Sequence, residues 1–129
     1  MNDFGGVDDL YRDFILDHYR HPRNAGTLEN PDATFEDNNP LCGDRIRMDV
    51  RIAGDRIDDV RFAGRGCAIS QASASLLTEA VKGKTVAEVE QLSDEAVLEN
   101  LGISISAVRL KCALLGIKVL KSALALKRG

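Results

Sequence analysis

The sequence predicts an α+β fold, in which a small antiparallel sheet is accompanied by several helices. Polar and apolar residues alternate over residues 45–52 and again over residues 57–62, and a period of two is typical of half-buried strands. Apolar residues instead recur at helical spacing over residues 7–19, over residues 67–81 and from residue 107 onward. The strand signals therefore lie together, with helix signals on either side.

The two alternating segments are expected to pair as a β-hairpin, because only the turn residues 53–55 (Ala-Gly-Asp) separate them. Residues 33–37 are expected to add a short edge strand after the turn at Pro31. The side chains expected to face the core are Ile46, Met48, Val50, Ile52, Val60 and Phe62.

Turn and capping residues mark the expected helix ends. The first helix is expected to stop at Pro22, and the helix of residues 67–81 at Gly83. A capping-box pattern opens a short helix over residues 85–90, and a second short helix over residues 93–101 ends at Gly102.

The composition favours one globular domain over residues 1–129. Hydrophobic residues make up 44% and charged residues 29%, which is unlike a disordered chain. Aromatic residues make up 5% and Trp is absent, so the core is expected to be aliphatic and no stacking platform for bases is expected. The net charge of −3 also argues against nucleic acid as a partner.

The thiols are expected to be reduced. No apolar run approaches the roughly 20 residues that span a bilayer. Residues 1–4 carry an acidic Asp3 and are followed by no hydrophobic stretch, so they do not begin a secretory signal. A cytoplasmic location is therefore expected, where structural disulfides are rare. The chain has three cysteines, an odd number, which favours metal ligands or reactive thiols.

Three cysteines and one aspartate are expected to form a four-coordinate site for a thiophilic metal: Cys42, Asp44, Cys67 and Cys112. Cys42 and Asp44 open one strand of the predicted hairpin, and Cys67 follows the other strand. An antiparallel hairpin brings those two ends together. Cys67 also lies at a predicted helix N-terminus, where the helix dipole favours a thiolate.

Simpler interpretations exist for some of these residues. Taken alone, Cys67 also allows a simpler interpretation as a small buried cysteine at a helix start. His18 and His21 have a spacing that allows metal binding, although no cysteine is near them in sequence and histidines are common at helix ends.

The cysteine spacing excludes several kinds of site. No Cys-x-x-Cys pair is present, so the patterns of zinc fingers, ferredoxins and thioredoxin-like proteins are absent. Zinc and iron–sulfur centres both take thiolate ligands, so the sequence alone does not distinguish the two kinds of centre. A carboxylate is a harder ligand than a thiolate, which suits a centre that is loaded and released.

Three motifs resemble those of the iron–sulfur cluster assembly scaffold family of IscU, SufU and the NifU N-terminal domain. They are residues 39–44 (Asn-Pro-Leu-Cys-Gly-Asp), residues 66–70 (Gly-Cys-Ala-Ile-Ser) and Lys111-Cys112. Residues 11–26 also resemble the family's first helix and loop, so the similarity covers nearly the whole chain.

The resemblance implies a compact two-layer domain, with a three-stranded antiparallel sheet covered by about four to six helices. It also implies that Cys42, Asp44, Cys67 and Cys112 form the site. These residues would receive sulfur from a cysteine desulfurase and carry a nascent [2Fe–2S] cluster, or Zn²⁺ in its place, for transfer to apoproteins or cluster carriers.

The chain combines features of two branches of that family. Lys111 precedes Cys112, as in SufU-type chains, where IscU-type chains have histidine. Cys67 and Cys112 are 45 positions apart, which is the shorter IscU-like spacing. Residues 103–108 lack the Leu-Pro-Pro-Val-Lys segment of IscU, so recognition by a dedicated Hsp70-type chaperone is not expected.

Three functions remain open on the sequence: a cluster scaffold, which is not an enzyme in the usual sense; a zinc-dependent sulfurtransferase; and a zinc-stabilised binding module. In the sulfur-accepting functions, Cys112 is the expected acceptor and the positive charge of Lys111 is expected to favour its thiolate. The simpler alternative makes Lys111 an ordinary solvated lysine.

Overall fold

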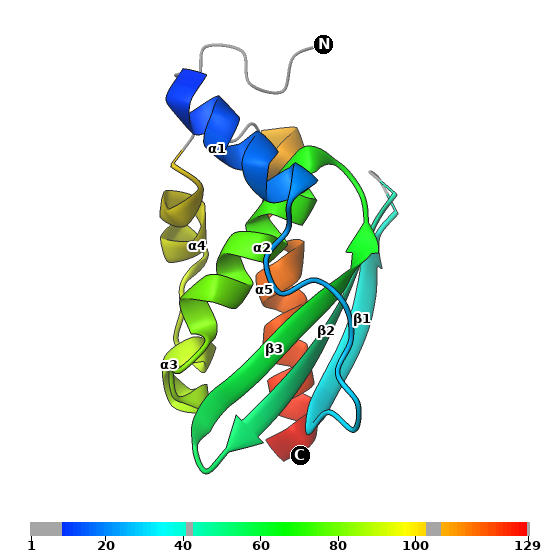
Figure 1. The fold of residues 1–129 in the computed structure, drawn as a ribbon, viewed down its shortest axis with the longest axis vertical. Coiled ribbons are helices and arrows are strands. Elements are labelled where there is room, and N and C mark those ends of the chain that lie inside the picture. Colours follow the sequence, from blue (N-terminus) through cyan, green and yellow to red (C-terminus); the bar gives the residue numbers. More distant parts are fainter. Residues whose placement is uncertain (1–8, 41–42, 103–106, 129) are drawn as a thin grey trace.

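The computed structural model describes residues 9–40, 43–102 and 107–128, and its strands form one antiparallel sheet (Figure 1). The strands are β1 (Ala33–Asn39), β2 (Asp44–Ala53) and β3 (Arg56–Arg65), arranged in the order β1-β2-β3. The expected hairpin is confirmed as β2 and β3. The edge strand β1 is two residues longer than expected, because Asn38 and Asn39 pair with Arg45 and Asp44.

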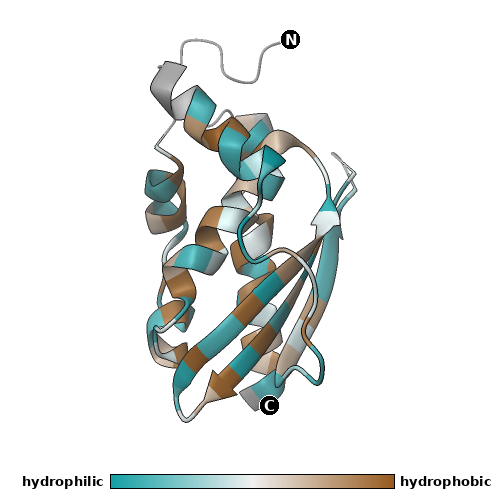
Figure 2. Ribbon diagram, viewed as in Figure 1, coloured by the Kyte–Doolittle hydropathy of each residue, from teal (hydrophilic) through white to brown (hydrophobic). Residues whose placement is uncertain are grey.

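Two helices cover one face of this sheet. They are α2 (Ala68–Val81) and α5 (Ala107–Arg128), and they pack against each other and against the strands (Figure 1). Ile46, Met48 and Val50 of β2 are fully buried beneath them. Figure 2 shows the alternation of hydrophobic and hydrophilic residues along the strands. The predicted inward face is confirmed, except that Ile52 is only half-buried.

The opposite face of the sheet is partly covered by the chain between α1 and β1. Phe62 N–H donates to the Asn24 carbonyl oxygen (3.0 Å), which holds this segment on β3. The carboxylate of Asp49, on this face of β2, is 1% exposed. It accepts hydrogen bonds from Thr34 Oγ1 (2.7 Å) and Leu28 N–H (3.0 Å). A charged residue at an outward strand position is therefore buried by a loop.

The shorter helices are α1 (Asp9–Arg20), α3 (Val86–Glu90) and α4 (Asp94–Leu101). The capping box predicted for α3 is present: Glu88 N–H donates to Thr85 Oγ1 (3.1 Å), and Thr85 N–H donates to Glu88 Oε1 (3.0 Å). Gly102 ends α4 with φ of 71°, as expected of a left-handed C-cap. The five helices and the three-stranded sheet of the described residues confirm the expected α+β class. Among the described residues, no helix is long and apolar enough to cross a bilayer.

The helix α1 packs on α2, and His18 is buried between them. His18 Nδ1 lies 2.8 Å from Ser75 Oγ, and that hydroxyl also accepts a hydrogen bond from Arg23 N–H (2.9 Å). His21 is exposed just after α1. Neither histidine belongs to the group of candidate metal ligands found among the described residues. The structure therefore gives His18 a packing role.

Protonation of His18 is expected to destabilise the protein below about pH 6.5. Burial holds the pKa of His18 below its ordinary value of 6.5, and the nearby Arg23 guanidinium lowers this pKa further, while Glu79 and Asp17 partly oppose it. Because the unfolded chain binds the proton more readily, the free energy of unfolding falls as the pH drops below 6.5.

His18→Gln is expected to flatten the stability profile between about pH 7 and pH 5, at a constant cost of about 1–2 kcal/mol from the lost buried hydrogen bond. Urea unfolding at a series of pH values measures this. The exposed His21 supplies the matched control, His21→Gln, which should keep the wild-type slope. A His18→Gln profile with the wild-type slope would show that another group causes the pH dependence.

Candidate metal centre

Three of the four predicted donors meet at one end of the sheet. One ligand atom each from Asp44, Cys67 and Cys112 lie within 4.8 Å of one another. These residues come from the start of β2, from the end of the β3–α2 connection and from α5. Side chains separated by up to 68 positions in the sequence are thus brought to one centre.

The hairpin places Asp44 beside Cys67. Arg45 pairs with Arg65 in the register of β2 and β3, so the chain leaves the sheet directly opposite the first residues of β2. Cys67 is the N-cap residue of α2, as the sequence predicted. Its backbone N–H donates to Asp44 Oδ1 at 2.9 Å. The carboxylate therefore serves as the side-chain acceptor at the start of this helix.

Gly66 makes this approach possible. A Cβ atom at Gly66 would lie 2.2 Å from Asp44 Oδ1 and 2.7 Å from Ser70 Oγ. The φ angle of 154° at Gly66 is also one that residues with side chains rarely adopt. The Gly-Cys pair is thus a steric requirement for bringing Asp44 against Cys67.

The second oxygen of Asp44 lacks a compensating contact. Asp44 is 0% exposed, and its Oδ2 atom has no hydrogen-bond partner among the described residues. A buried carboxylate oxygen without a partner is costly in free energy. One oxygen of the Asp44 carboxylate lies within 4.8 Å of two cysteine sulfurs, so this residue fits a monodentate ligand of a metal ion. The donor set is suited to Zn²⁺ or iron.

The third donor is fully enclosed. Cys112, on α5, is 0% exposed, whereas Cys67 is half-buried. Neither forms a disulfide with another described residue. The side-chain amide of Asn39 contacts the Cys112 sulfur, with 3.9 Å between Nδ2 and Sγ. Asn39 is part of the Asn-Pro-Leu-Cys-Gly-Asp motif, but the sequence offered no signal for this contact with a residue 73 positions away.

Cys42 lies outside the described residues, so its part in the site stays a prediction. Its neighbours in sequence are close to the other donors. Gly43 N–H donates to the Asn39 carbonyl oxygen (2.9 Å), and Asn39 pairs with Asp44 at the end of the β1–β2 ladder.

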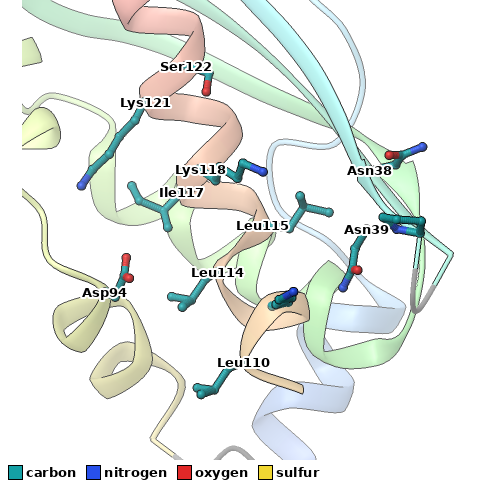
Figure 3. A pocket seen from close by; sticks show the side chains of 12 residues that line it. Asn38, Asn39, Asp94, Leu110, Leu114, Leu115, Ile117, Lys118, Lys121 and Ser122 are labelled. Atoms are coloured by element: carbon teal, nitrogen blue, oxygen red, sulfur yellow. The ribbon is translucent and has the colours of Figure 1, made fainter. Parts of the chain in front are cut away.

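A groove of about 650 Å³ runs along α5 from this end of the sheet (Figure 3). Leu110, Leu114 and Ile117 contribute apolar side chains to it, and Asn39 borders it near the candidate site. Lys111 is exposed and is one of the residues that line the groove. The residue before Cys112 is therefore accessible to a partner.

The chain matches the family model described as the NifU-like N-terminal domain over residues 10–127. It is 40% identical over 140 aligned positions to the zinc-dependent sulfurtransferase SufU of Bacillus subtilis, with 95% of each chain covered. It is 35% identical over 115 positions to the iron–sulfur cluster assembly scaffold protein IscU 1 of Archaeoglobus fulgidus, covering 89% of this chain and 74% of that protein. The Escherichia coli scaffold protein IscU is 33% identical over 119 positions, with coverages of 89% and 91%.

Solved structures show the same fold. A putative iron–sulfur cluster assembly scaffold protein for the SUF system, from Fervidobacterium islandicum, is 32% identical with a TM-score of 0.74, covering 86% of this chain and 93% of that one. A NifU-like N-terminal protein from Brucella abortus is 20% identical with a TM-score of 0.78, and the alignment covers 94% of this chain and 96% of that one. At this identity the similarity supports the fold alone. The matched model, the identities and the fold agree, and the chain belongs to the family of NifU-like N-terminal domains, together with IscU and SufU proteins.

Proposed function

We propose that this protein is an iron–sulfur cluster assembly scaffold, which accepts sulfur from a cysteine desulfurase and holds a nascent [2Fe–2S] cluster for transfer to apoproteins. Cys42, Asp44, Cys67 and Cys112 are the proposed ligands, and Zn²⁺ is the proposed occupant when no cluster is present. The observation that carries the proposal is the convergence of Asp44, Cys67 and Cys112, together with a buried Asp44 carboxylate whose Oδ2 atom has no hydrogen-bond partner among the described residues.

The arrangement of Asp44 favours reversible binding of a metal or cluster. A carboxylate is a weaker ligand than a thiolate for a soft centre. Asp44 Oδ1 is already engaged by the Cys67 N–H, so the carboxylate can keep its place in the fold while Oδ2 gains or loses a metal. Such a ligand lowers the free-energy cost of releasing the metal, and the start of α2 stays folded.

The enclosure of Cys112 bears on sulfur acceptance. Because the thiol is 0% exposed, a sulfur donor reaches it only after a local rearrangement. In the proposed step the Cys112 thiolate attacks the outer sulfur of the donor's cysteine persulfide. The S–S bond of the donor breaks, a new persulfide forms on Cys112, and the donor cysteine leaves as a thiolate. These steps need reduced thiols, as in the cytoplasm.

A zinc-dependent sulfurtransferase is the second candidate. It is favoured by the 40% identity to the Bacillus subtilis sulfurtransferase over 95% of both chains, and by Lys111 immediately before Cys112. In this function Zn²⁺ holds the donors in place, and one thiolate is released to take the persulfide sulfur. The same residues serve both candidates, which differ in whether iron is assembled on them.

Anaerobic incubation with iron, cysteine and a desulfurase separates the two. A scaffold is expected to develop visible sulfur-to-iron absorption that is lost in Cys67→Ser. A sulfurtransferase is expected to stay colourless with Zn²⁺ bound and to accelerate the desulfurase. A protein that does neither would retain only the role of a zinc-stabilised binding module, contrary to the proposal.

Lys111→Ala is expected to keep Zn²⁺ bound and to slow persulfide formation on the protein several-fold. An ammonium group has no lone pair for a metal, but its positive charge favours a thiolate nearby. Zinc content and desulfurase-coupled persulfide formation measure the two effects. Lys127→Ala, at an exposed position on the same helix, is the matched control and should change neither. Loss of zinc in Lys111→Ala, or an unchanged rate, would contradict the assigned role.

A further inference from the structure

We infer that Asn39 is a positioning residue of the metal centre, whose side-chain amide holds the Cys112 sulfur toward Asp44 and Cys67. The inference rests on the proposed function, because it concerns how this chain presents its donors to a metal. The contact is direct: Asn39 Nδ2 lies 3.9 Å from Cys112 Sγ. It joins the end of β1 to α5, two elements that pack against each other.

Asn39 is buried, so its contact with Cys112 is not a chance contact between exposed side chains. The residue is 6% exposed, although it is the last residue of an edge strand and carries a polar side chain. Its neighbour Asn38 is exposed, so the alternation along β1 turns Asn39 toward α5. Buried amides are retained where they have polar partners. A cysteine sulfur is such a partner here.

The backbone of Asn39 adds a second constraint. Its carbonyl oxygen accepts the hydrogen bond from Gly43 N–H (2.9 Å), and the residue faces Asp44 in the register of β1 and β2. One residue therefore binds to the beginning of the strand that carries Asp44 and to the helix that carries Cys112. A shift of Asn39 would move two of the donors relative to each other.

The chemistry of an amide beside a sulfur supports the same role. An N–H group directed at a thiolate orients it and withdraws electron density from it. Groups that contact metal ligands in this way tune the centre, and their removal typically weakens metal binding by about 10–100-fold.

The test replaces Asn39 with leucine, which has a similar size but no donor. Zn²⁺ affinity is measured by competition with a chromophoric chelator, and the Co²⁺-substituted protein is measured by absorption spectroscopy. Asn39→Leu is expected to weaken Zn²⁺ binding by about 10–100-fold. It is also expected to move the sulfur-to-cobalt charge-transfer band to longer wavelength, because the sulfur no longer shares charge with an N–H group. Asn39→Ala, which avoids any overpacking, should shift the band in the same direction.

Asn38→Leu is the matched control, since Asn38 is the neighbouring residue of β1 and is exposed. It should leave affinity and band position unchanged. An unshifted band in both Asn39 variants would overturn the inference even if affinity falls, because a purely structural role does not alter the electron density of the sulfur. An equal shift in Asn38→Leu would overturn it too. If wild-type protein binds neither ion, the proposed function fails before this inference is tested.

Discussion

Zinc at a thousandfold excess over its Kd is expected to raise the free energy of unfolding by about 4 kcal/mol, and Asp44→Ala is expected to remove a large part of this gain. The donors Asp44, Cys67 and Cys112 lie on three separate elements and meet only in the folded chain. An ion bound there stabilises the folded state by mass action. Losing one ligand should weaken Kd by more than about tenfold, or at least about 1.4 kcal/mol.

Denaturant unfolding with Zn²⁺ and with a chelator measures the gain for each variant. Comparing the two conditions within one variant removes any effect of Asp44→Ala on the metal-free fold, where the Cys67 N–H loses its acceptor. Asp58→Ala, at an exposed position of β3, is the control and should keep the whole gain. The gain should shrink at lower pH, since thiolate ligands must lose their protons. Unfolding curves that are indifferent to zinc would refute a preformed metal site.

Asp49→Ala is expected to destabilise the metal-free protein by about 2–4 kcal/mol. The Asp49 carboxylate accepts hydrogen bonds from Thr34 Oγ1 (2.7 Å), Leu28 N–H (3.0 Å) and Arg47 Nε (2.9 Å). Truncation to alanine removes the acceptor of these part-buried hydrogen bonds and loosens the loop that crosses the sheet. Urea unfolding measures the loss.

The same variant should also change the acid limb of the stability profile. Burial alone would raise the pKa of Asp49, but the hydrogen bonds from Arg47, Leu28 and Thr34 hold it below the ordinary value of 3.8. This contribution to stability is present above pH 3.8 and is lost as the pH falls through the lower pKa of the folded state. Asp49→Ala should therefore be less sensitive to acid than wild type, whereas Asp58→Ala should behave as wild type. A loss below about 0.5 kcal/mol, the range of ordinary surface substitutions, would mean that the buried network contributes little.

Local signals determined most of the fold. The capping box at Thr85, the left-handed glycine at Gly102 and the alternation over residues 45–52 each depend on neighbours a few positions away, and each is found in the structure as predicted. Local signals also predict part of the candidate site, because the antiparallel pairing of the hairpin brings Asp44 and the N-cap residue Cys67 together.

The sequence by itself determined the α+β class, the hairpin and the candidate donors, because these follow from periodicity, turn chemistry and residue type. Only the tertiary structure decided what covers each face. The loop before β1 buries Asp49, and an apolar cluster with residues from α1, α2 and α4 encloses Cys112. The packing of α5 against β1 sets the Cys112 sulfur beside Asn39. Periodicity assigns a side chain to one face of its own element. It carries no information on which distant segment packs there, and packing between distant segments is what sets the contacts of a buried polar group.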